Sequence, residues 1–116
     1  YFYQFCANWA TFSSDPGKSP VDAHMLVALM APRPLLLQTG DTDDWSDPKG
    51  EFLAAVAAEP VYALYGKKGP TDKMPAAGVP LLNDLGYYMH AGGHGSLPAD
   101  NDIFIRFLKM HLSAKR

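Results

Sequence analysis

The stretch Leu35-Leu36-Leu37-Gln38-Thr39-Gly40-Asp41-Thr42-Asp43-Asp44 decides the fold of this chain. Its first half is a short apolar run between Pro34 and Gly40, and a run bounded in this way is typical of a buried strand. Its second half is a polar, acidic loop. A second strand is predicted over residues 85–90, and the tight turn Ala91-Gly92-Gly93-His94-Gly95 follows it. Two strands are thus followed by loops that carry an acid and a histidine.

Helices are predicted between and around these strands. The predicted helices are residues 23–30 with Asp22 as N-cap, residues 48–65 with Asp47 as N-cap, and residues 98–112. Pro60 is expected to break or restart the middle helix because proline lacks the amide hydrogen. Residues 67–80, rich in proline, glycine and lysine, are expected to form an exposed excursion. Alternating helices and strands predict an α/β fold with parallel strands and helical crossovers.

The composition excludes several classes of protein. The 116 residues include 12 acidic and 10 basic side chains, so no basic excess is present to bind nucleic acid. The single cysteine, Cys6, rules out an internal disulfide framework and a multi-cysteine metal site. The longest apolar run, residues 25–31, is far too short to span a bilayer, so no membrane partner is expected. At 47% hydrophobic residues, the chain can still bury a core.

The beginning of the chain is unusual for a complete protein. It opens without methionine on Tyr1-Phe2-Tyr3-Gln4-Phe5 and lacks the features of a signal peptide. In addition, two parallel strands alone make a poor sheet, because both faces and both edges need cover. Truncation of a larger protein is therefore a hypothesis that the sequence supports.

The candidate catalytic residues are His94 and Asp43. Glycines on both sides of His94 leave its imidazole unshielded, and an imidazole with an ordinary pKa near 6.5 suits a general base. An acidic loop after one strand and a histidine loop after the next form the second half of the Ser, Asp/Glu, His order of α/β-hydrolases. The neighbouring aspartates Asp41, Asp44 and Asp47 are explained by capping and loop solvation.

No nucleophile, metal site or cofactor site is predicted. None of the serines lies in a Gly-x-Ser-x-Gly-like elbow between a strand and a helix, and Cys6 lacks the elbow glycines. The histidines show no metal-ligand spacing, since His90 and His94 lie in a strand and the turn after it, not at i, i+4 of a helix, and His24 and His111 are far away. Trp45, beside the acidic loop, has two open interpretations: a core residue, or an aromatic surface that stacks on a flat or sugar-like ligand.

Three segments resemble the glucuronoyl esterases, which form carbohydrate esterase family fifteen, and the match looks closest to bacterial members. The segments are residues 21–34 (VDAHMLVALMAPRP), residues 43–52 (DDWSDPKGEF) and residues 92–95 (GGHG). The resemblance implies a three-layer α/β-hydrolase fold with a mostly parallel sheet. It also implies that residues 1–116 are the C-terminal part of a single catalytic domain, whose N-terminal remainder would supply the serine.

The resemblance further implies the chemistry. Family members cleave esters between (4-O-methyl-)glucuronic acid of xylan and lignin alcohols, or small uronate esters, without a cofactor. His94 would be the base, Asp43 the acid unless an upstream Glu serves instead, and Trp45 part of the sugar subsite. A secreted or periplasmic location is expected. The alternatives are another serine esterase of this fold, such as an acetyl xylan esterase, and a small non-catalytic α/β binding module.

Overall fold

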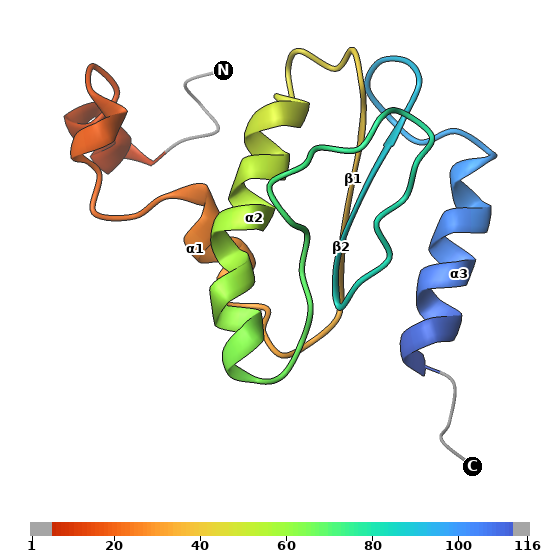
Figure 1. The fold of residues 1–116 in the computed structure, drawn as a ribbon. Coiled ribbons are helices and arrows are strands. Elements are labelled where there is room, and N and C mark those ends of the chain that lie inside the picture. The colour runs from red at the N-terminus through yellow and green to blue at the C-terminus, as the bar shows by residue number, and fades with distance from the viewer. Residues whose placement is uncertain (1–5, 113–116) are drawn as a thin grey trace.

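A two-stranded parallel sheet lies at the centre of the chain, whose residues 6–112 are described by a computed structural model (Figure 1). Its parts are β1 (Leu35–Gly40), α2 (Pro48–Leu64) and β2 (Leu85–His90). The strands pair in parallel, with Leu35 opposite Leu85 and Gly40 opposite His90. The predicted strands and their parallel order are therefore confirmed.

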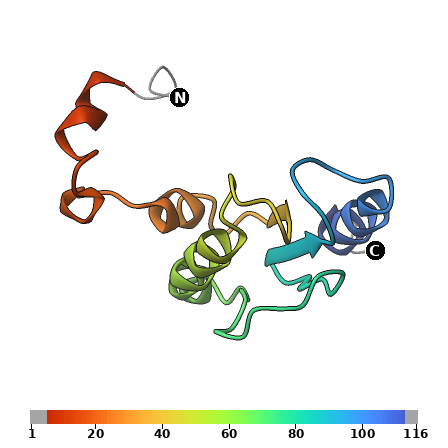
Figure 2. The same cartoon turned by 90° about the horizontal axis from the view of Figure 1, so that it is seen from above.

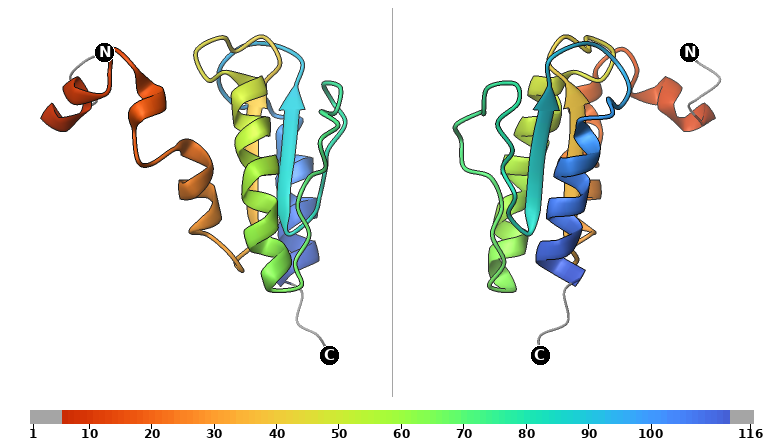
Figure 3. Two further views of the ribbon diagram at one scale, coloured as in Figure 1. Left: turned by 60° about the vertical axis from the view of Figure 1, so that its left-hand side comes forward. Right: turned by 90° about the vertical axis from the view of Figure 1, so that its right-hand side faces the viewer.

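The sheet lies between helices on both faces (Figure 2). Helix α1 (Ala23–Ala28) and α2 cover one face, and α3 (Asp100–Leu112) covers the other. The segment before α1 holds 3₁₀ turns and extends away from the sheet (Figure 3). The aromatic run Tyr1–Phe5, which suggested an unusual start, lies outside the described residues. Within those residues, no helix is long and apolar enough to cross a membrane.

The core is built between α2 and the sheet. One cluster joins the α2 residues Ala55, Ala58 and Tyr62 to Leu85 of β2. The second cluster joins Phe52 of α2 to Tyr87 and Met89, and the rings of Phe52 and Tyr87 meet edge to face with centroids 5.2 Å apart. Every residue of β2 is buried, so this strand is held from both sides. Burial of this apolar surface contributes most of the free energy that holds α2 against the strands.

Helix α2 runs through Pro60 without a break, so the prediction that Pro60 breaks or restarts it is wrong. Pro60 lies on the exposed side of the helix, where water can solvate the carbonyl that loses its partner. Ala58 and Tyr62, on either side of Pro60 in the sequence, are fully buried in the same cluster. Packing of this face therefore keeps one helix continuous despite the proline.

The prediction of an exposed excursion over residues 67–80 is confirmed in part: half of these residues are exposed, most of the others are partly buried, and the end of the segment covers the free edge of β2. The amide of Gly78 donates to the Met89 carbonyl over 2.8 Å, and Leu81 forms an antiparallel bridge with Tyr87. Among the described residues, the opposite edge of β1 pairs with no strand. One edge of the small sheet is thus protected, and the other is open.

Candidate active site

Two loops meet at the carboxyl ends of the strands. We call residues 41–47, after β1, the acid loop, and residues 91–99, after β2, the histidine loop. Because parallel strands end at the same edge of a sheet, both loops lie together above it (Figure 3). The order of elements alone therefore brings residues from distant parts of the sequence into one site.

The two loops are fastened to each other directly. Asp41 accepts a hydrogen bond from the Gly92 amide over 2.8 Å, and the Thr42 amide donates to the Gly92 carbonyl over 3.0 Å. Gly92 has a φ of 130°, a conformation that side chains rarely tolerate. Asp41 was explained from the sequence by capping or solvation, but the structure shows that it ties the histidine loop to the acid loop.

The central contact of the site joins His94 to Asp43. The His94 Nδ1 lies 2.8 Å from the Asp43 Oδ2, although the residues are 51 positions apart. Ser46 donates its hydroxyl to the same carboxylate oxygen over 2.7 Å, and its amide donates to the other oxygen. A carboxylate only accepts, so the His94 Nδ1 carries the hydrogen, and in the neutral imidazole Nε2 keeps a lone pair.

Exposure divides the pair into an inner and an outer partner. The Asp43 residue is only 4% exposed, whereas the His94 side chain is 80% exposed. The His94 Nε2 makes no hydrogen bond to any residue in the described part of the chain. An imidazole whose Nδ1 is held by a buried carboxylate and whose Nε2 is open to solvent has the arrangement of a general base.

The electrostatics of the acid loop keep Asp43 ionised. The Ser46 hydroxyl, and then the hydrogen bond to His94, hold the pKa of Asp43 below its ordinary value. Burial raises the pKa of Glu51, in the first turn of α2, and the charges of Asp43 and Asp47 raise it further. Neighbouring carboxyl groups are thus pushed in opposite directions, a pattern that is typical of active sites.

A small pocket adjoins the pair. Its volume is about 260 Å³, and its lining includes Asp43, His94, Ser46 and Ser96. The two serines do not point their hydroxyls at His94, since Ser46 donates to Asp43 and Ser96 donates to Gln38. Among the described residues, no group of three or more potential metal ligands comes together.

Trp45 lies in the acid loop and is 81% exposed, so its interpretation as a core residue is wrong for this structure. The loop turns outward at this point, before Asp47 caps α2 by accepting a hydrogen bond from the Gly50 amide. The other interpretation, an aromatic surface for a ligand, stays a prediction.

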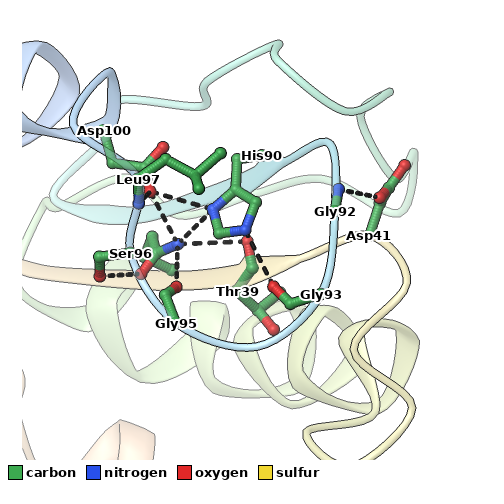
Figure 4. A network of polar contacts seen from close by, with 10 residues as sticks. Thr39, Asp41, His90, Gly92, Gly93, Gly95, Ser96, Leu97 and Asp100 are labelled. Atoms are coloured by element: carbon green, nitrogen blue, oxygen red, sulfur yellow. Dashed lines mark hydrogen bonds and ion pairs between the residues drawn. The ribbon is translucent and has the colours of Figure 1, made fainter.

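Sequence reasoning missed a polar cluster beneath the histidine loop. Figure 4 shows the His90 ring within the curve of this loop, and its Nδ1 lies 3.0 Å from the Asp100 Oδ2. The sequence signal was weak, because Asp100 looks like an ordinary acidic residue in the first turn of a helix. His90 is the last residue of β2, and the other residues of that strand are apolar, glycine or tyrosine. A histidine at this position was the one signal in the sequence.

Comparisons with known proteins match this chain to esterases. A family model described as "Glucuronyl esterase, fungi" matches residues 2–66, more than half of the chain. A carbohydrate esterase from an unknown prokaryotic organism is 37% identical over 110 residues, which are 94% of this chain and 26% of that relative.

Solved esterase structures are similar to this chain in backbone fold as well as in sequence. A promiscuous CE15 esterase from a marine bacterial metagenome has a TM-score of 0.87 and 38% identity, over 92% of this chain and 27% of that one. The glucuronoyl esterase from Solibacter usitatus has a TM-score of 0.83 and 40% identity, over 90% of this chain and 27% of that one. The chain spans about a quarter of the length of these relatives.

Proposed function

Because the chain belongs to the glucuronoyl esterase family, we propose that it supplies the base and the acid of a serine-type carboxylic ester hydrolase. The observation that carries this proposal is the 2.8 Å contact between the His94 Nδ1 and the Asp43 Oδ2 at the ends of neighbouring parallel strands. This contact also supports Asp43, rather than an upstream Glu, as the acid.

The proposed reaction is a two-step acyl transfer. The His94 Nε2 accepts the proton of a serine hydroxyl while the serine oxygen attacks the ester carbonyl. His94 then gives this proton to the departing alcohol, which leaves an acyl-enzyme. Water repeats the sequence and releases the acid. Asp43 holds the imidazole in the required tautomer and stabilises its charged form.

We further propose that residues 1–116 are the C-terminal part of one α/β-hydrolase catalytic domain with a three-layer, mostly parallel sheet. The remainder of that domain would pair with the open edge of β1 and bring the nucleophilic serine. Two observations support this arrangement: the described residues leave that edge unpaired, and the chain spans about a quarter of its relatives.

The proposed substrates are esters of (4-O-methyl-)glucuronic acid, either with lignin alcohols on xylan or with small alcohols. Family membership and the exposed indole of Trp45 beside the pair support this class, because aromatic rings stack on sugar faces. One related structure is described as promiscuous, so simpler esters such as acetylated xylan are the second candidate. Since such polymers lie outside cells, we propose a secreted or periplasmic location.

A chimera tests the proposal. In the Solibacter usitatus esterase, the segment that this chain matches is replaced by this chain, and we call the product the chimeric esterase. We expect it to hydrolyse the methyl ester of glucuronic acid, and we expect His94→Ala to lower kcat/KM by about a thousandfold or more. His24→Ala, which changes a histidine on α1 whose ion pair is with Asp22, is the matched control. A folded chimera that is inactive, or that is indifferent to His94→Ala, would contradict the proposal.

A further inference from the structure

A buried polar cluster lies directly beneath the loop that carries His94. It consists of two buried residues, His90 at the end of β2 and Asp100 at the start of α3 (Figure 4), and of Gln38 from β1, which is partly buried; we call it the buried triad. His90 is 3% exposed and Asp100 is 0% exposed. None of the uses proposed above involves these residues, and His90 is too enclosed to meet a substrate.

The buried triad holds the backbone on both sides of His94. The His90 Nε2 lies 3.0 Å from the carbonyl oxygen of Gly93, the residue before His94. The Gln38 amide donates to the carbonyl of Gly95, the residue after it, over 3.3 Å. The peptide group before His94 and the carbonyl of the residue after it are therefore both anchored from below.

Asp100 anchors the far end of the same loop and lies beside the ring of His90. Its Oδ2 accepts a hydrogen bond from the Leu97 amide over 2.7 Å and lies 3.0 Å from the His90 Nδ1. The Gly93 carbonyl can only accept, so the His90 Nε2 must carry a hydrogen. In the neutral imidazole Nδ1 is then an acceptor, and the Gln38 amide nitrogen, 2.9 Å away, donates to it.

Stability alone gives little reason for this cluster. Burying a histidine and a carboxyl group carries a desolvation cost, and apolar replacements of buried polar pairs are often neutral or stabilising. The loop above them, in contrast, contains Gly92 and Gly95 with positive φ and has little intrinsic stiffness. A fixed imidazole on a glycine-rich loop requires an external support, and the buried triad provides it.

We propose that His90, oriented by Gln38 and packed beside Asp100, is a positioning residue for His94. The Nε2–H of His90 fixes the Gly93 carbonyl and so keeps the His94 Nδ1 within hydrogen-bond reach of Asp43. This inference rests on the proposed function for its catalytic consequence, but its structural consequence, the tautomer of His94, is measurable without catalysis.

The test compares two amide variants in the chimeric esterase. His90→Gln places an amide nitrogen near the position of Nε2, whereas His90→Asn places one near Nδ1 and leaves the Gly93 carbonyl without a donor. We expect His90→Asn to lower kcat about 10- to 100-fold with KM nearly unchanged, because small misplacements of a catalytic group have effects of this size. His90→Gln is expected to recover most of the loss.

A spectroscopic measurement on the same proteins does not depend on turnover. The ring ¹⁵N shifts of His94 report whether Nδ1 carries the hydrogen. We expect the Nδ1–H form in the unsubstituted chimera and in His90→Gln, and a mixture of tautomers in His90→Asn. If the unsubstituted chimera is inactive but the shifts behave in this way, the proposed function fails while the positioning role stands.

Other results would overturn the inference. If both variants lower only the melting temperature and leave kcat and the His94 shifts unchanged, His90 is merely structural. If His90→Gln loses as much kcat as His90→Asn and shifts the His94 tautomer equally, the Nε2 contact is not the support.

Discussion

The Cα of Gly40 faces the carbonyl oxygen of Gly93 so closely that a Cβ at position 40 would overlap it. The same Cβ would overlap the Gly92 carbonyl. The histidine loop therefore crosses directly over the end of β1, and the site depends on the absence of one side chain there. Gly40 has no unusual positive φ, so the requirement is for space and not for backbone conformation.

We expect Gly40→Ala to separate the histidine loop from the acid loop. Backbone atoms must move to admit the methyl group, and the contact between His94 and Asp43 lengthens with them. In the chimeric esterase, kcat should fall about a hundredfold, the size expected when a catalytic group is displaced by about 1 Å. Gly17→Ala is the control, since a Cβ there meets only the Asp15 carboxylate at 3.4 Å. Equal kcat in both variants would show that the crossing is not required.

Removal of the Ser46 hydroxyl should change how stability depends on pH. This hydroxyl is the main cause of the low pKa of Asp43. A carboxyl whose pKa is lowered by folding adds stability above its unfolded pKa and loses it as pH falls through the folded value.

Ser46→Ala is therefore expected to lower the melting temperature of the chimeric esterase near neutral pH. The difference from the unsubstituted protein should shrink as the pH falls below about 4, the ordinary range of an aspartate pKa. Ser13→Ala, which removes a hydroxyl bonded to a backbone carbonyl, should show no such pH dependence. A Ser46→Ala difference that stays constant with pH would argue against the role of Ser46.

Trp45 offers a test of the substrate class. If its exposed ring stacks on the sugar, Trp45→Ala should raise KM for the glucuronate methyl ester about tenfold, within the range for loss of an apolar contact. Hydrolysis of p-nitrophenyl acetate, which has no sugar, should be nearly unchanged. Tyr65→Ala, another exposed aromatic residue but at the far end of α2, is the control. Equal effects on both esters would favour a general esterase.

The isolated chain distinguishes a domain part from a self-standing module. Leu26, Leu29 and Leu64 are each more than 70% exposed, and a groove of about 750 Å³ lies between α1 and α2. With these surfaces and the open edge of β1, the 116 residues alone should bind a hydrophobic dye and melt without a sharp transition. A monomer with a cooperative calorimetric transition would instead favour a small binding module.

The parts of the structure that the sequence predicts are those with local signals. The apolar run between Pro34 and Gly40 was enough to place β1, and a helix between two strands was enough to make them parallel. Parallel strands share one carboxyl edge, so the meeting of Asp43 with His94 was also predictable.

The remaining features depend on packing between distant segments. Pro60 lies within a continuous helix because the residues on either side of it are packed into the core. The local sequence shows only a proline, which normally ends a helix. The contact between His90 and Asp100 exists because α3 begins beneath the histidine loop, which no local pattern indicates. Residues 78–81 pair with β2 although proline and glycine dominate their surroundings.

A double-mutant cycle on the chimeric esterase tests most directly whether Asp43 and His94 act as one catalytic unit. The measured quantity is kcat/KM for the glucuronate methyl ester in Asp43→Ala, His94→Ala and the double variant. We predict a loss of about a thousandfold or more for His94→Ala, and a double variant that is no slower, because groups that act as a unit are not additive. An Asp43→Ala variant with unchanged kcat/KM, or losses that multiply in the double variant, would contradict the account.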